Sequence, residues 1–304
     1  MSKKFFPVFA IIFFISTVWV FPDVQDIAGR ADKLNEEENY KEEKNVLLDS
    51  LEKASGNSDM AELYWRLARA ILNLGDEAEK NGSGPDILLK IFEEGKSYAS
   101  RAIELDPGNH LGYFWKSANI GRWGQIKGVL NALMQADEMR DLLETAVTLK
   151  PDHAVSFYVL GQLYEQVPGF PISFGNAGYS VSLGRKAIDL HEEQYRNGNE
   201  KKFDYDYYNE LAKHLYKRNW SVTRRKREHG KMEDEYKAET GILEKSFYYE
   251  GTIKIKNITD REEARNLLEW VITGLEGITN RTKEQSDDLK EAKETLSSWQ
   301  PASG

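Results

Sequence analysis

The sequence contains no cysteine, and this absence excludes disulfide bonds, thiolate metal sites and cysteine nucleophiles. Proline and glycine are sparse, with 8 and 23 residues in 304, which suits a helical protein better than an all-β one. Basic residues are outnumbered, because 41 Lys and Arg face 50 Asp and Glu and leave a net charge of −9. A nucleic-acid-binding protein needs basic surface for the phosphates, so we expect no nucleic-acid partner.

Motifs of common active sites are missing as well. The run Gly82-Ser83-Gly84-Pro85 is not followed by the Lys and Ser or Thr of a phosphate-binding loop, and no Gly-x-Ser-x-Gly elbow occurs. The five histidines are scattered and have no His-x-x-x-His spacing that would indicate a metal site. We therefore expect a non-catalytic protein with no catalytic residues, no cofactor and no metal.

Most of the sequence after Asp23 has the apolar periodicity of helices. The longest run with the alternating pattern of a β-strand is only Thr252-Ile253-Lys254-Ile255-Lys256. The clearest unit is Phe157-Tyr158-Val159-Leu160-Gly161-Gln162-Leu163-Tyr164. An aromatic residue followed by Leu-Gly and then Tyr is typical of the start of a tetratricopeptide repeat. Such repeats bury their apolar faces only by stacking. The pattern predicts an all-α, tetratricopeptide-like α-solenoid of about four to five helical hairpins.

The ends of the second helices give the repeat length. Ala102, Ala146 and Ala187 occupy equivalent places and are separated by 44 and 41 residues. A standard tetratricopeptide repeat is shorter, at about 34 residues. Each unit therefore carries an insertion between its helices. Farther along, Thr259-Asp260-Arg261-Glu262 reads as a capping box that opens a helix through Leu275, and a last polar helix is expected from Thr282 to Trp299.

A family resemblance accompanies these repeats. The sequence Trp65-Arg66-Leu67-Ala68-Arg69-Ala70, the repeat ends at Pro107 and Pro151, and Phe157–Gly161 resemble the regulator of microtubule dynamics family, over roughly Leu63 to Leu190. That resemblance implies tetratricopeptide-like repeats, often behind an N-terminal membrane anchor. The loop Pro168–Asn176 is more similar to bacterial, spirochaete-type relatives of the group. A looser similarity is to exported helical-repeat proteins of tripartite periplasmic transporters, although those carry a lipid-bearing cysteine that this chain lacks.

The N-terminus combines Lys3 and Lys4 with an apolar run from Phe5 to Phe21. Its seventeen residues lie at the lower limit for spanning a bilayer, and no small-x-small cleavage site follows. We expect an uncleaved signal anchor in residues 1–22, or a cleaved signal peptide as the alternative, then a repeat domain in 23–218 and a helical C-terminal extension in 219–304. The two lysines would keep the N-terminus cytoplasmic and place the body on the periplasmic or extracellular side. A microtubule role would not carry over to such a chain.

Six residues are expected on the concave side of the first helices. Aromatic and arginine side chains there suit a peptide or carboxylate partner, although the aromatic ones could instead pack between helices. The six are Trp65, Arg69, Phe114, Arg122, Tyr158 and Gln162.

The Pro168–Asn176 loop supplies further candidate contacts, Phe170, Phe174 and Asn176. It could touch a partner, act as a lid, or plug a gap between helices. The basic stretch Lys213 to Lys231 could contact anionic lipid or an acidic partner, or form a solvated face paired with glutamates.

Together these features predict a membrane-anchored or exported scaffold that binds a protein or peptide in its concave groove. The alternative is an accessory ligand-binding component of a periplasmic transport system.

Overall fold

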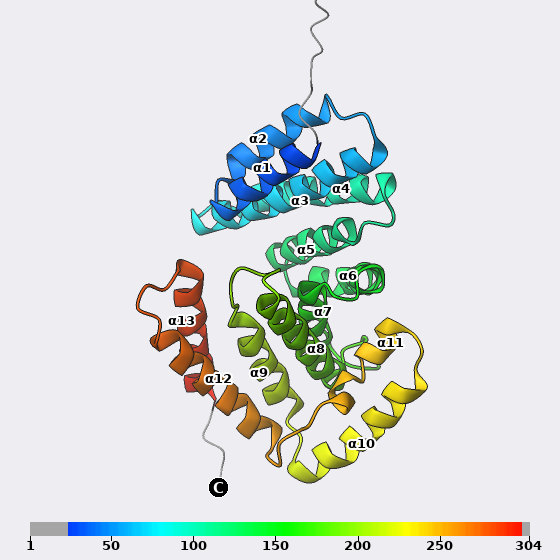
Figure 1. Ribbon diagram of the computed structural model, residues 1–304, viewed down its shortest axis with the longest axis vertical. Coiled ribbons are helices and arrows are strands. Elements are labelled where there is room, and N and C mark those ends of the chain that lie inside the picture. The colour runs from blue at the N-terminus through cyan, green and yellow to red at the C-terminus, as the bar shows by residue number, and fades with distance from the viewer. Residues whose placement is uncertain (1–23, 300–304) are drawn as a thin grey trace, which may run out of the picture.

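The computed structural model describes residues 24–299, and within this range the protein is all-helical, which confirms the expected fold class at that level (Figure 1). The elements are α1 (Val24–Glu36), α2 (Tyr40–Leu51), α3 (Asn57–Lys80), α4 (Pro85–Leu105), α5 (His110–Lys127), α6 (Val129–Leu149), α7 (Ala154–Gln166), α8 (Ala177–Arg196), α9 (Asp206–Arg218), α10 (Val222–Ala238), α11 (Ile242–Ser246), the 3-10 helix η1 (Tyr249–Thr252), α12 (Asp260–Glu276) and α13 (Lys283–Ser298). The hydrophobic helix and signal anchor expected in residues 1–22 lie outside the described residues. Among the helices of residues 24–299, none combines the length and apolar character needed to cross a bilayer.

Sequence neighbours stack on one another through most of the chain, as an α-solenoid requires. Helix α3 packs on α4, α4 on α5, α5 on α6 and α7 on α8. Figure 1 shows α1 to α4 at one end, α5 to α8 beneath them, α9, α12 and α13 on one flank, and α10 and α11 on the other. Helix α12 packs on α9, and through this contact the C-terminal helices join the stack.

Two glycines allow α7, α8 and α9 to approach closely. A Cβ atom on Gly161 of α7 would lie 3.2 Å from Nε2 of His214, and one on Gly184 of α8 would lie 3.1 Å from Cδ2 of the same ring. The imidazole of His214, on α9, therefore packs directly against both glycines, and a larger residue at either position would press against the ring. Gly161 is the glycine of the Leu-Gly pair on which the predicted repeat was based.

The largest apolar core runs through this stack and into the C-terminal helices. It joins Phe157 and Leu160 of α7, Leu183 of α8, Leu215 of α9 and Leu268 of α12, all of them fully buried. Burial of such side chains is the main source of stability in a helical stack. Helix α12 thus shares a core with α7, α8 and α9.

A buried ion-pair network reinforces this junction. Arg218, at the end of α9, donates hydrogen bonds from Nε and Nη2 to the Asp260 carboxylate, each 2.8 Å long, and others to Glu250. Arg185 of α8 donates to Glu250 at 3.0 Å and to Glu263 at 3.1 Å. Arg225 of α10 completes the network, because it pairs with Asp260 at 3.0 Å and with Glu263. Three arginines balance three carboxylates, which buried charges require.

The basic stretch Lys213 to Lys231 is therefore divided in the structure. Arg218 and Arg225 are buried in the network and cannot form part of a lipid-facing or solvated surface. Lys226, Arg227 and Lys231 of α10 are exposed, and the last two pair with Glu228. The expected capping box is confirmed at α12, where Thr259 and Glu262 bond to each other's backbone N–H groups.

Candidate functional site

The two predicted groove residues on α3 are engaged within the chain. Trp65 is 5% exposed, and the guanidinium of Arg66 lies 4.0 Å from its ring centroid. Arg69 forms ion pairs with Glu43 of α2 at 2.6 Å and with Asp32 of α1 at 2.8 Å. Arg69 thus helps to hold α1 and α2 against α3, and Trp65 is buried beside it.

Phe114 and Arg122, predicted on α5, also have partners inside the protein. Phe114 is buried and meets the ring of His153 edge-to-face at 5.2 Å. Arg122 donates to Asp76 of α3 at 2.7 Å and to Glu79. The two carboxylates neutralise the guanidinium that we expected to face a partner.

Tyr158 and Gln162 come together on α7. The Tyr158 hydroxyl donates to the carboxylate of Asp206 at the start of α9, and Gln162 Nε2 donates to that hydroxyl at 3.0 Å. Burial, followed by the negative charge of Asp206, raises the pKa of Tyr158 far above its ordinary value. The phenol therefore stays protonated and acts as a hydrogen-bond donor.

The three candidate contact residues in the loop between α7 and α8 have different surroundings. Phe170 is 93% exposed. Phe174 packs edge-to-face on Tyr164 at 5.3 Å, and the guanidinium of Arg140 lies 4.5 Å from the Phe174 ring centroid. Asn176 caps α8 by accepting hydrogen bonds from two backbone N–H groups. Of the three, Phe170 alone presents its side chain to solvent.

An acidic groove lies elsewhere, lined by residues of α13, of α3 and of the end of α1. Its volume is about 700 Å³, and the loop between α8 and α9 contributes to its wall. Seven carboxylates line it, against three lysines. Asp76 pairs with Arg122 and Glu36 with Lys201, and the remaining five carboxylates still leave the groove with an excess of negative charge. The carboxylates are Glu36, Glu38, Asp76, Glu77, Glu284, Asp287 and Asp288, and the lysines are Lys80, Lys202 and Lys283.

A side pocket of about 200 Å³ adjoins the acidic groove and shares Lys202, Glu284 and Asp288 with it. Phe203 and Tyr207 also line this side pocket, together with further polar groups. Aromatic surface beside carboxylates suits the aliphatic stem and charged head of a lysine or arginine.

Asp288 is the central group, because it lines both cavities. Its residue is only 9% exposed, and among residues 24–299 no hydrogen bond or ion pair reaches its carboxylate. Burial raises the pKa of Asp288 to about 7, with further contributions from the negative charges of Asp206, Asp204 and Glu284. The Asp288 carboxylate opens onto both cavities without a counter-ion from the described part of the chain, so a cation supplied from outside would bind here favourably.

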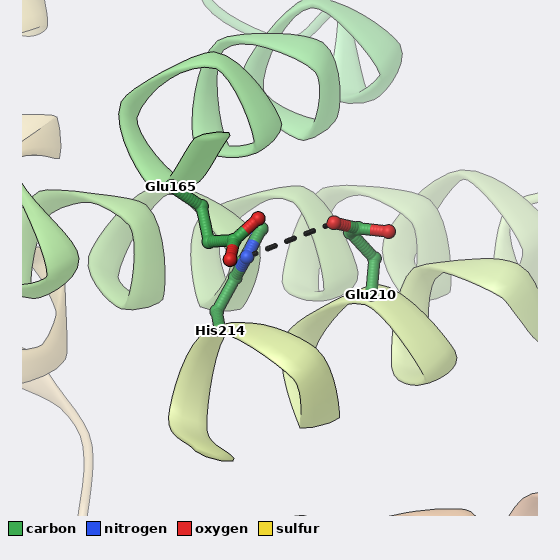
Figure 2. Close-up of side chains that lie close together, drawn as sticks. All are labelled: Glu165, Glu210 and His214. Atoms are coloured by element: carbon green, nitrogen blue, oxygen red, sulfur yellow. Dashed lines mark ion pairs between the residues drawn. The ribbon is translucent and has the colours of Figure 1, made fainter. Parts of the chain in front are cut away.

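A second cluster lies between α7 and α9, where Glu165, Glu210 and His214 converge (Figure 2). Their potential ligand atoms all lie within 4.8 Å of one another. Lys213 pairs with Glu210 at 2.5 Å, and Lys217 pairs with Glu165 at 3.2 Å. A metal site was not predicted here because the sequence has no His-x-x-x-His spacing. The spacing Glu210-x-x-x-His214 nevertheless places two ligand types on one helix face.

Comparisons with known proteins point to one family. Residues 27–169 match the family described as regulator of microtubule dynamics protein 1-3. Regulator of microtubule dynamics protein 1 of Bos taurus is 31% identical over 104 residues, which are 34% of this chain and 32% of the bovine protein. The mouse protein of the same name is 26% identical over 161 residues, 53% of this chain and 50% of that protein. The chain thus spans between a third and a half of the length of these relatives.

These findings support the family resemblance at low identity, over the N-terminal half of the chain. They also overturn the predicted function and localisation, because the relatives are mammalian regulators of microtubule dynamics. A membrane-anchored or exported scaffold on the periplasmic side was therefore the wrong prediction, and so was the transport accessory offered as its alternative. The membrane and export parts of these predictions had been inferred from the apolar run Phe5 to Phe21, which lies outside the described residues, as does the predicted membrane contact.

Proposed function

We propose that this chain is a non-catalytic relative of the regulator of microtubule dynamics family that binds a protein partner, and that the acidic groove receives a lysine- or arginine-rich segment of that partner. The proposal includes a tetratricopeptide-like organisation of the helices, supported by the Ala102, Ala146 and Ala187 offsets and by the close approach at Gly161. The names of the relatives suggest that the partner acts in microtubule dynamics.

The observation that carries the groove assignment is the unpaired carboxylate of Asp288. It is 9% exposed and faces two cavities, and the charges that, after burial, raise its pKa are those of Asp206, Asp204 and Glu284, although Lys202 also lines both cavities. A cationic side chain entering the groove would give Asp288 a charge-assisted hydrogen bond and relieve the repulsion among these acids. Other surface carboxylates, such as Glu104 with Arg101, already have a basic partner in the chain.

The shape of the site favours an extended segment over a single ion. The acidic groove offers about 700 Å³ and the side pocket about 200 Å³, and the two share a wall. One basic side chain would enter the side pocket beside Phe203 and Tyr207 while its neighbours lie along the groove carboxylates. Arginine fits best, because its planar guanidinium can stack on an aromatic ring and fork onto a carboxylate.

A binding experiment tests the groove. A fluorescein-labelled peptide of alternating Arg and Gly is titrated with the 304-residue chain, and anisotropy gives its Kd. We expect Asp288→Asn to weaken binding roughly tenfold, which corresponds to about 1.4 kcal/mol. Glu104→Gln, on the exposed face of α4, should leave the Kd unchanged. Equal affinities of the wild type and Asp288→Asn would contradict the groove assignment.

The microtubule part of the proposal has its own test. The chain is added to polymerising tubulin, and growth and shrinkage rates are measured by fluorescence microscopy. We expect the wild type to change these rates and Asp288→Asn to have a smaller effect. Unchanged rates with the wild type would remove the microtubule role and leave the groove assignment to be judged by the peptide titration.

A further inference from the structure

The imidazole of His214 is buried without a hydrogen-bond partner. Its residue is 0% exposed, and neither ring nitrogen forms a hydrogen bond within residues 24–299. Nδ1 lies 3.7 Å from Oε1 of Glu210, which is beyond hydrogen-bond range, and Nε2 lies against the space left by Gly161. A neutral imidazole has one donor and one acceptor, and leaving both unpaired in the core is unfavourable.

Two carboxylates stand at the place where this unpaired ring could be satisfied. Glu210 precedes His214 by one helical turn on α9, and Glu165 reaches the same point from the last turn of α7 (Figure 2). One nitrogen and two carboxylate oxygens form a ligand set typical of Zn²⁺ and related divalent ions. Three protein ligands are the number found in zinc sites that keep a fourth position open.

We propose that Glu165, Glu210 and His214 bind a divalent transition-metal ion, with Zn²⁺ as the best match. Glutamate side chains are long enough to rotate inward from the present spacing of up to 4.8 Å to the separations that metal bonds of about 2.0–2.2 Å require. Bound there, the ion joins α7 to α9 and occupies the unpaired face of the imidazole.

Each of the two lysines beside the cluster has a second partner that it can keep when an ion takes its place, the backbone carbonyl of Glu165 for Lys217 and Glu291 for Lys213. Lys217 is 49% exposed at its side chain, so its pair with Glu165 is a weak surface ion pair. Lys213 has a second partner, Glu291, at 2.9 Å and can keep that contact after leaving Glu210. Glu165 is itself 16% exposed, and the ion can enter from that side.

Calorimetry and thermal unfolding of the untagged 304-residue chain with ZnCl₂ test this proposal. We expect one Zn²⁺ per chain and a rise in Tm with Zn²⁺ concentration, because an ion that binds only the folded state stabilises it. Glu165→Gln should weaken Zn²⁺ binding at least tenfold. Lys217→Gln should strengthen binding several-fold, because it removes a competing cation. Substitution by Co²⁺ should give the intense visible absorption of a tetrahedral site.

Matched control variants distinguish Zn²⁺ binding at this cluster from binding at other carboxylates. Glu94→Gln removes a carboxylate that also pairs with one lysine across two helices, Lys44 at 2.8 Å, and should leave the Zn²⁺ affinity unchanged. Glu104→Gln, at the exposed pair with Arg101 on α4, should leave it unchanged as well. The proposal is overturned if the wild type shows no Zn²⁺ binding, or if Glu165→Gln and Lys217→Gln both bind Zn²⁺ as the wild type does. Glu165 and Lys217 are both partly exposed, so the fold should survive either change.

Discussion

Tyr158 and Asp206 are linked across α7 and α9 by a hydrogen bond in which the phenol donates to the carboxylate. Gln162 donates to the same phenol oxygen at 3.0 Å, so two of the six predicted groove residues belong to one polar cluster between helices. Their polar groups are therefore used within the chain, and the cluster fixes α7 against the start of α9.

Loss of this bond should destabilise the protein in a pH-dependent way. Burial raises the pKa of Asp206, and the Tyr158 hydrogen bond opposes that rise. In Tyr158→Phe the opposing bond is gone, so the pKa of Asp206 rises further. A raised carboxyl pKa means that stability is lost as pH increases through it. We therefore expect a loss of about 1–2 kcal/mol at pH 8 and a smaller loss at pH 4, measured by urea unfolding.

Tyr113→Phe is the matched control for that variant. Its hydroxyl donates to the carbonyl of Pro107 at 3.2 Å in an exposed setting. Water can replace such a bond, so its removal should cost less than about 0.5 kcal/mol. Equal losses for the two tyrosine variants at both pH values would show that Asp206 does not depend on Tyr158.

The close approach of α7 to α9 gives a second prediction, on glycine. Gly161→Ala should destabilise the protein by about 1–3 kcal/mol, because the new methyl meets His214 at 3.2 Å and the Ser180 carbonyl at 3.3 Å. Gly230→Ala on α10 meets nothing within 4 Å and should stabilise by up to about 1 kcal/mol through helix propensity. Thermal unfolding of both variants measures these opposite signs. Two changes of the same sign would contradict the packing account.

A third prediction concerns the buried ion-pair network. Burial favours a raised pKa for Glu250, but the charges of Arg218 and Arg185 outweigh burial and hold it at about 2. Arg218→Met leaves Glu250 and Asp260 without their main partner and should cost about 3–5 kcal/mol. Arg227→Met removes an exposed pair with Glu228 and should cost less than about 0.5 kcal/mol. Urea unfolding at pH 7 compares the two, and similar losses would mean that the network adds nothing beyond surface pairing.

Local features of the fold could be predicted from the sequence. The Thr259–Glu262 capping box and the helix after it depend on four consecutive residues, and the structure confirms both. Such features depend on propensity and capping, which act over one or two turns.

The partners of the charged residues could not be predicted in the same way. Arg69 pairs with Glu43 and Arg122 with Asp76, partners that lie 26 and 46 residues away. The acidic groove brings Glu36 and Asp288 together from opposite ends of the chain. Helical periodicity indicates which face of a helix is apolar but not which distant acid meets which arginine.

The last prediction concerns Asp288 and its dependence on pH. The pKa of about 7 lies above the value near 3.9 of an unfolded aspartate, so the folded state binds the proton more tightly between these values. Stability should therefore fall as pH rises from about 4 through 7, since protons favour the folded chain in that window. Asn resembles the protonated acid and does not titrate. Relative to wild type, Asp288→Asn should be neutral at pH 4 and more stable by about 1–3 kcal/mol at pH 8.

Urea unfolding at the two pH values measures this difference, with Asp287→Asn on the exposed neighbouring position as the control. That control should change stability equally little at both. The Arg-Gly peptide links stability to function, because a bound guanidinium replaces the missing counter-ion of Asp288. Its affinity for the wild type should therefore rise between pH 6 and pH 8, as the carboxylate ionises, and stay nearly constant for Asp288→Asn. A stability difference independent of pH would mean that Asp288 is already neutralised within the fold, and the acidic groove would then have no unpaired charge to offer a partner.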